Sequence, residues 1–286
     1  MKELSISKSI LSISSPGVSL QPGEAAAALE LARKCNDFAR ELVVRRPHQF
    51  DFWASLPLPD VPGSLAEISY ALDTLHPAGF ALKTNYHGLY LGDVAFDAVF
   101  EKLNEEKATV FIHPTTPCIR HKHGNECTSV TILEQYPNPM FEFMFDTARA
   151  LINLFVSGTI SRCPNITFVI PHASGALPPL VQRFCWINNM MLNTDMQLSS
   201  QIVKETFKRQ FYFDLAGFPF PDQIHGILRF VGPEKLLYGT DFPFTPAKGC
   251  EGLAVMMKSG LEELFPDADI REAIYSGNAK RLFLKY

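Results

Sequence analysis

The sequence predicts an α/β fold in which parallel strands alternate with helices, either closed as a barrel or doubly wound. Short β-rich runs alternate with segments of helical periodicity along the 286 residues. The runs are almost continuously apolar, which is typical of parallel strands covered by helices. No linker, repeat or low-complexity tract divides the chain, and a (β/α)₈ barrel needs about 250 residues. A single barrel domain over residues 1–286 is therefore expected.

Seven runs are predicted strands because each is apolar and is closed by Pro, Gly or polar residues. They cover residues 9–14, 50–56, 79–84, 108–113, 166–172, 211–215 and 235–239. A complete (β/α)₈ barrel has eight strands. Residues 2–7 read like the end of a helix, so we expect the uncounted unit, one strand and most of its helix, on the N-terminal side. A gap should then lie between the first and last of the seven strands.

The segments between the strands predict helices from apolar residues spaced three and four apart. The first helix, 23–46, should bury one face and end before Pro47, and the second should open on a capping box from Ser64 to Glu67. The expected buried face of the first helix is Leu31, Cys35, Phe38 and Leu42. Further helices are expected around residues 96–103, 139–156, 180–191, 221–230, 248–259 and 270–284.

Composition excludes several classes of protein. The chain is 47% hydrophobic and 20% charged with a net charge of −4, so neither nucleic acid nor an anionic membrane is an expected partner. Its six cysteines form no C-x-x-C pair, which favours reduced thiols in a cytosolic protein. The N-terminus lacks the apolar run of a signal peptide, and no stretch reaches the length of a membrane span. A cytoplasmic location is therefore expected.

Three candidate site residues stand at the carboxyl ends of predicted strands, where active sites of parallel α/β barrels lie. His113 ends the fourth run, His172 the fifth, and Asp241 follows the seventh. One such His alone is more often a structural hydrogen-bonding residue. Three of these groups at one rim favour function, because imidazole and carboxylate bind divalent metals and move protons. We expect the three side chains to converge on one point.

Other polar residues support weaker hypotheses. Asn85 lies in a turn after the third run, where it can close the turn or contact a substrate. Arg149 lies three residues after Asp146 on a helix, and it can form a surface ion pair or bind a substrate carboxylate. Asp214 can be a polar group of the barrel interior or a partner that orients a site residue. The pair His121 and His123 has H-x-H spacing but lies in a polar loop, which favours a solvated role.

Several motifs occur in an order that resembles a known family. They are His113-Pro114, PHASGALP at 171–178, YGTDFP at 238–243 and GNAKRLF at 277–283. Together they resemble the amidohydrolase-related family that includes aminocarboxymuconate-semialdehyde decarboxylase and the non-oxidative decarboxylases of hydroxybenzoic acids. The stretches LKTNY at 82–86 and YLGD at 90–93 look most like the 6-methylsalicylate decarboxylase branch, an enzyme type of secondary metabolism.

This resemblance implies a TIM (β/α)₈-type metal-dependent hydrolase barrel that here lacks its first strand. It implies that His113 and Asp241 bind a divalent metal ion, zinc or manganese. It also implies that His172 and Asp241 act in catalysis, and that Arg149 binds the substrate. Asn85, from its place at the rim, is a second candidate for substrate binding. The substrate would be a small aromatic carboxylic acid such as 6-methylsalicylate, and a homodimer is left open as an assembly.

The family's first strand normally supplies two more ligands in an H-x-H pair, which this sequence does not contain at that place. Two protein ligands are fewer than the three of a catalytic zinc site, so we expect weak metal binding and low activity. The leading hypothesis is a metal-dependent carboxy-lyase. The alternatives are a metal-dependent hydrolase of a lactone or C–C bond, and an inactive or truncated paralogue that acts as a binding protein.

Overall fold

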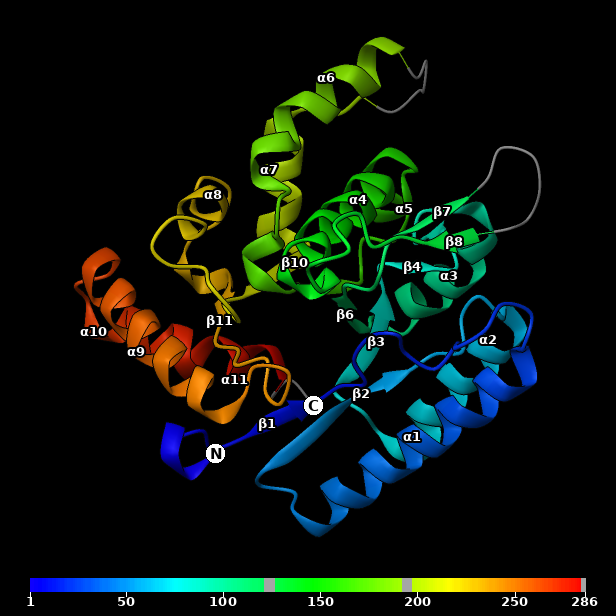
Figure 1. The fold of residues 1–286 in the computed structure, drawn as a ribbon, viewed down its shortest axis with the longest axis horizontal. Coiled ribbons are helices and arrows are strands. Elements are labelled where there is room, and N and C mark those ends of the chain that lie inside the picture. The colour runs from blue at the N-terminus through cyan, green and yellow to red at the C-terminus, as the bar shows by residue number, and fades with distance from the viewer. Residues whose placement is uncertain (121–126, 192–196, 284–286) are drawn as a thin grey trace. The chain divides into compact units, whose positions relative to one another are not determined.

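The computed structural model describes residues 1–120, 127–191 and 197–283, which form two compact units, Met1–Thr167 and Phe168–Tyr286. Each unit contains parallel strands accompanied by helices (Figure 1). All seven predicted runs contain a strand, and each strand is shorter than its run. The alternation of parallel strands and helices that the apolar runs predicted is therefore confirmed in the described stretches.

The first unit has four parallel strands, paired in the order β1, β2, β3 and β6. Their bounds are Ser9–Leu11, Phe50–Ser55, Gly79–Lys83 and Thr109–His113. The register sets Lys83 of β3 beside His113 of β6. Side chains of register partners in a parallel pair point to the same face of the sheet. These two residues therefore share one face at the carboxyl ends of their strands.

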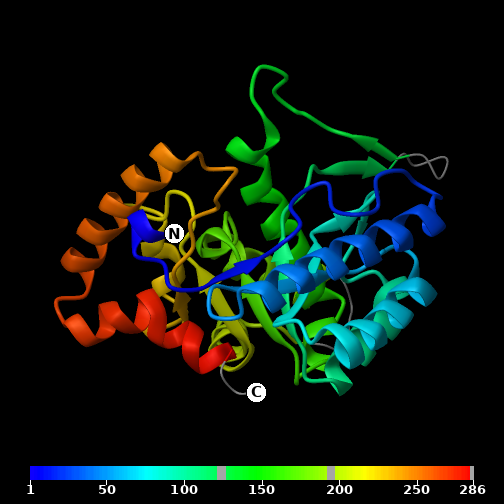
Figure 2. The ribbon, with the colours of Figure 1, turned by 90° about the horizontal axis from the view of Figure 1, so that it is seen from below.

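Helices α1 (Ala25–Arg45), α2 (Val61–Tyr70) and α3 (Asp97–Glu105) follow β1, β2 and β3. Figure 2 shows α1 and α2 beside each other, and α1 also packs on β2. A π-helical turn, Ala71–Leu75, extends α2, and 3₁₀ turns occur at Lys2–Leu4 and Val94–Phe96. The buried side chains of β2, the segment after it, β3 and these helices form the core of this unit: Phe52, Leu56, Leu58, Ile68, Phe80, Leu82, Phe96 and Phe100.

The predicted buried face of α1 is wrong. Its fully enclosed side chains are Ala28, Ala32 and Asn36, whereas Phe38 is 59% exposed. Small side chains let the helix backbone approach the sheet closely, and the Asn36 amide adds hydrogen bonds to Ser55 of β2 at 3.0 and 2.8 Å. Contact with the sheet therefore decides which face of α1 is buried. The larger apolar residues of α1 lie beside this contact face.

The predicted capping box is also wrong. Helix α2 begins three residues before Ser64, and the side chain of Asp60 caps it by accepting from the Gly63 amide at 3.1 Å. Glu67 does not turn back to the helix start, because Arg33 and Asn36 donate to its carboxylate at 2.9 and 2.8 Å. A buried carboxylate gains more from these charge-assisted bonds than from a cap.

Two hairpins and further helices follow the strands. The antiparallel pairs are β4 (Asn85–Tyr86) with β5 (Leu89–Tyr90), and β7 (Cys118–Arg120) with β8 (Cys127–Ser129). A 3₁₀ turn (Asn138–Met140) precedes α4 (Glu142–Val156), and α5 (Thr159–Arg162) ends the unit. The sequence analysis anticipated α4 but neither hairpin.

The expectation that all six cysteines are reduced is corrected by Cys118, which is disulfide-bonded. Cys118 lies on β7. The cysteine spacing alone did not reveal this disulfide. The thiols of Cys35, Cys185 and Cys250 are not in disulfides.

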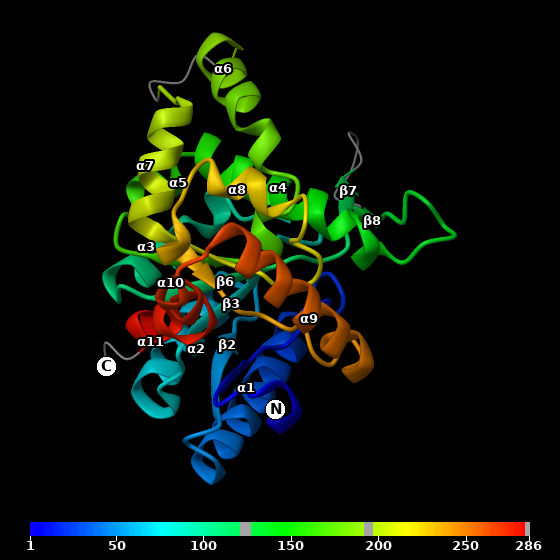
Figure 3. The ribbon, with the colours of Figure 1, turned by 90° about the vertical axis from the view of Figure 1, so that its left-hand side faces the viewer.

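The second unit has three parallel strands, with β10 (Phe211–Asp214) between β9 (Thr167–Ile170) and β11 (Leu236–Leu237). Its helices are α6 (Val181–Met191), α7 (Ser200–Gln210), α8 (Ile224–Leu228), α9 (Ala247–Leu264), α10 (Ala268–Glu272) and α11 (Asn278–Phe283). Figure 3 shows α6 and α7, which pack together, and α9 leading into α10. Short turns lie at His172–Ser174, Pro178–Leu180, Pro233–Lys235 and Ala273–Gly277.

Stacked and edge-on phenylalanines form the core of the second unit. Phe211 of β10 stacks on Phe168 of β9 with ring centroids 5.0 Å apart, and Phe207 of α7 contacts both Phe211 and Phe213 at 5.0 and 5.2 Å. Aromatic pairs of this kind add about 0.5–1.5 kcal/mol beyond their buried area. This cluster fixes β10 and therefore the loop after it.

Candidate functional site

His113 ends β6 with its ring held by the backbone. Its Nδ1 lies 2.6 Å from the carbonyl oxygen of Pro114, and its Nε2 lies 3.4 Å from Ser14 Oγ. A carbonyl oxygen only accepts, so Nδ1 carries a proton. A histidine whose second nitrogen is fixed by a backbone carbonyl is the usual form of a metal ligand. The environment of His113 therefore suits the role predicted for it.

Lys83, the register partner of His113, was not among the predicted site residues. Its side chain is 4% exposed, and Nζ donates to the carbonyl oxygen of Ile13 at 2.5 Å. Burial alone lowers the pKa of Lys83 to about 7. A charged residue that closes the apolar run GFALK at a strand end was the signal that could have identified it.

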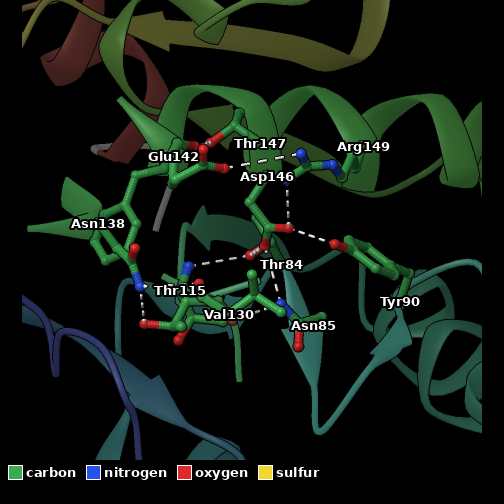
Figure 4. Close-up of polar contacts among 12 residues, drawn as sticks. Thr84, Asn85, Tyr90, Thr115, Val130, Asn138, Glu142, Asp146, Thr147 and Arg149 are labelled. Atoms are coloured by element: carbon green, nitrogen blue, oxygen red, sulfur yellow. Dashed lines mark hydrogen bonds and ion pairs between the residues drawn. The ribbon is translucent and has the colours of Figure 1, made fainter. Parts of the chain in front are cut away.

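A network around Asp146 anchors the loop that follows His113. The Asp146 carboxylate is fully buried and accepts hydrogen bonds from the hydroxyls of Thr84 and Tyr90 and from Asn85 Nδ2, the last at 3.0 Å (Figure 4). Thr84 Oγ1 also accepts from the Thr115 amide at 3.1 Å. Burial, together with the charge of Asp146, raises the pKa of Tyr90, which keeps this hydroxyl a donor.

The two predicted substrate-binding residues both belong to this network. Asn85 is 4% exposed, donates to Asp146 and to the Thr116 carbonyl at 3.2 Å, and accepts from the Gly88 amide at 3.2 Å. Arg149 is 43% exposed and forms ion pairs with Asp146 at 3.5 Å and Glu142 at 3.8 Å. These contacts give both residues a structural role, and substrate binding by them stays a prediction.

His172 lies in a strained turn of the second unit. Its φ is 53°, and the next two residues, Ala173 and Ser174, also have positive φ, at 49° and 70°. Such left-handed backbone costs about 1–3 kcal/mol per residue and clusters at functional sites. His172 Nδ1 lies 3.1 Å from the Ala216 carbonyl oxygen, which only accepts, so Nδ1 donates to it and this contact leaves Nε2 for other partners.

Two carboxylates lie near His172 within the same unit. Asp214 accepts from the backbone amides of His172 and Ala216 at 2.9 and 3.0 Å. Burial raises the pKa of Asp214, and the charge of His172 opposes this. Burial likewise raises the pKa of Asp241; the charge of His172 lowers it and that of Asp214 raises it. Asp214 therefore orients a site residue, which is one of the two roles anticipated for it.

The structure thus brings His172 and Asp241 near each other in one unit and places His113 in the other. The convergence of all three on one point stays a prediction. Within each unit, the described residues contain no cluster of three or more His, Cys, Asp or Glu side chains that could hold a metal. The pair His121 and His123 lies outside the described residues.

Residues 12–284 match the sequence profile of the family described as amidohydrolase. The chain belongs to this family. It is 34% identical over 287 residues to the decarboxylase macB of Penicillium terrestre, covering 97% of this chain and 81% of that protein. It is 35% identical over 248 residues to a 6-methylsalicylic acid decarboxylase of Penicillium expansum, covering 86% of this chain and 73% of that protein.

Solved structures of this amidohydrolase family share the fold. A crystal structure of an amidohydrolase II superimposes with a TM-score of 0.86 at 31% identity, covering 100% of this chain and 86% of that chain. A dihydroxybenzoic acid decarboxylase from Polaromonas sp., with bound manganese and the inhibitor 2-nitroresorcinol, has a TM-score of 0.81 at 22% identity, covering 99% and 83%. The predicted α/β barrel class is therefore confirmed. No described helix is both long and apolar enough to cross a membrane.

Proposed function

We propose that this amidohydrolase-family protein is a metal-dependent, non-oxidative decarboxylase of a small aromatic hydroxy acid such as 6-methylsalicylate. The observation that carries the proposal is its 34–35% identity, over most of its length, to fungal proteins named as decarboxylases. Two histidines at the ends of strands, with their Nδ1 atoms fixed by carbonyl oxygens, support it, since this leaves Nε2 as the atom for metal ligation or proton transfer. We also propose that both units belong to one domain, because the family match spans them.

The residues proposed to hold a divalent ion, zinc or manganese, are His113 through Nε2 and Asp241 through its carboxylate. The Nδ1 hydrogen bond of His113 to the Pro114 carbonyl oxygen fits this role, because it leaves Nε2 as the ligating atom. When bound, such an ion would polarise the carboxylate and the ortho hydroxyl of the substrate. Manganese in the related Polaromonas enzyme supports a divalent ion as the cofactor.

The protein's own residues supply the proton. Asp241 or His172 would deliver a proton to the ring carbon that bears the carboxylate. The bond from this carbon to the carboxylate then breaks, carbon dioxide leaves, and the bonding electron pair returns to the ring and restores aromaticity. The Ala216 carbonyl and the Asp214 carboxylate keep the His172 ring and backbone in place for this step.

The test is incubation of the metal-loaded protein with 6-methylsalicylate, with carbon dioxide and 3-methylphenol measured together. Equimolar release of the two products is expected, with a loss of about 100-fold or more in His172→Gln, since general acid–base groups contribute about 10²–10⁴-fold. The surface variant Lys34→Met is the matched control and should keep full activity, because its side chain is 69% exposed.

Three results would contradict the proposal. Turnover of a lactone without carbon dioxide release from any hydroxybenzoate would favour hydrolysis. Metal and aromatic-acid binding without any turnover would favour a binding protein. Full activity in His172→Gln would remove this residue from the reaction.

A further inference from the structure

Lys83 is a buried cation that the proposed mechanism does not use. It is 4% exposed, and among the described residues its ammonium group hydrogen-bonds to a neutral group, the carbonyl oxygen of Ile13. None of the carboxylates that the structure describes forms an ion pair with it. An unpaired charge out of water costs several kcal/mol, so a residue of this kind needs an explanation outside the packing of the fold.

The segment that follows β1 confines the Lys83 side chain. The segment after β1 lies over it: Ile13 accepts from Nζ, and a Cβ built on Gly17 would lie 3.0 Å from Lys83 Cε. Gly17 has a φ of +87°, which favours glycine and lets the backbone pass close to the lysine stem. The stem is therefore confined between β3 and this segment.

The ammonium group also stands where a substrate would bind. Lys83 ends β3 and is the register partner of His113, so both side chains leave the same face at the carboxyl ends of their strands. Ser14, from the segment that covers Lys83, lies 3.4 Å from His113 Nε2. Lys83, residues 13–17 and His113 thus lie next to one another within the first unit.

We propose that Lys83 is a substrate-binding residue whose ammonium group pairs with an anionic oxygen of the aromatic acid. An ammonium has three N–H donors, and Ile13 uses one of them. The remaining donors match a carboxylate or phenolate oxygen, which supplies the counter-charge that the protein does not. The substrate class rests on the proposed function, but the binding role itself does not require turnover.

The test measures binding by calorimetry with wild type, Lys83→Met and Lys83→Arg, and with Lys34→Met as the control for loss of one surface charge. Lys83→Met should bind 6-methylsalicylate about 10–100-fold more weakly, as expected for one lost charge-assisted hydrogen bond, and Lys83→Arg should recover part of this. Lys34→Met should bind as wild type does. Equal affinity, within twofold, of Lys83→Met and wild type would overturn the proposal.

Two further probes identify the oxygen. 2-Methylbenzoate lacks the hydroxyl and 3-methylphenol lacks the carboxylate. If Lys83 pairs with the carboxylate, Lys83→Met weakens binding of 2-methylbenzoate and spares 3-methylphenol; if it pairs with the hydroxyl oxygen, the reverse holds. Wild-type decarboxylation with unchanged binding in Lys83→Met would refute this inference alone, whereas weakened binding without any turnover would refute the proposed function alone.

The melting temperature separates a binding role from a structural one. Removing an unpaired buried charge should leave the melting temperature of Lys83→Met equal to or above that of wild type, since binding residues are often kept at a cost in stability. If Lys83→Met does not fold, Lys83→Gln replaces it, because the amide keeps a donor for Ile13 without the charge. Failure of both variants to fold would make Lys83 a structural residue and overturn the proposal.

Discussion

Replacing Asp146 with alanine should produce one of the largest losses of stability available in the first unit. The carboxylate is fully buried and accepts from three donors, on buried Thr84 and Asn85 and on half-buried Tyr90 (Figure 4). Asp146→Ala leaves all three without this acceptor. A buried donor without a partner costs about 1–3 kcal/mol.

Simple addition would overstate the cost, because groups in one network are not independent. We expect a loss of about 4 kcal/mol in the free energy of unfolding, within the range of about 3–5 kcal/mol for breaking a buried charged pair. For a chain of this length, that corresponds to a fall in melting temperature on the order of 10 °C. Urea unfolding followed by circular dichroism measures the first quantity, and calorimetry the second.

The same variant should also weaken the site, since Thr84 holds the Thr115 amide and Asn85 holds the Thr116 carbonyl, both just after His113. Loss of residues that orient a metal ligand lowers affinity about 10–100-fold. Manganese titration of the folded variant at low temperature tests this part.

Arg149→Met is the matched control for the Asp146 network. It removes the exposed partner at 3.5 Å and keeps the three hydrogen-bond donors of Asp146, so its cost should be about 0–1 kcal/mol. Two results would refute the reasoning. One is a free energy of unfolding of Asp146→Ala within about 1 kcal/mol of wild type, far below the cost of breaking a buried charged pair. The other is an Arg149→Met variant that is destabilised as much as Asp146→Ala.

Other predictions concern the second site histidine, the helix α1 contact and the metal. Gly217 has a φ of +75°, and a Cβ there would lie 3.2 Å from His172 Nδ1, so Gly217→Ala should cost about 1–2 kcal/mol of stability and lower kcat; an unchanged kcat would contradict this. Glu67→Ala should lower the free energy of unfolding in urea by about 3–5 kcal/mol, because Arg33 and Asn36 lose their carboxylate acceptor. Glu67→Gln should lower it less. Dialysis against a chelator should remove the metal readily, because two protein ligands bind a divalent ion more weakly than three or four; stoichiometric metal after dialysis, measured by mass spectrometry, would contradict this.

The sequence by itself was sufficient for the order of the seven parallel strands and for the family, although helix α7 was not predicted. An apolar run such as residues 79–84 is long enough for a strand and too short for a helix, and a parallel strand buried on both faces needs just this pattern. His113, His172 and Asp241 could be proposed because each follows such a run, and strand ends are where parallel barrels bind ligands. The hairpins could not, since they depend on cross-strand pairing rather than on local pattern, and the cysteine spacing gave no sign of the Cys118 disulfide.

Only the tertiary structure decided which side chains are enclosed and what they contact. The buried face of α1 belongs to Ala28, Ala32 and Asn36 because β2 lies against the small side chains, which no helical periodicity reveals. Asp146 became the centre of a network, and Arg149 an ion-pair partner, because β3, β4, β5 and α4 meet there. Lys83 was overlooked because its neighbour Ile13 is 70 residues away in the chain, and hydrogen bonding and desolvation depend on distance in space, whereas sequence patterns report only local periodicity.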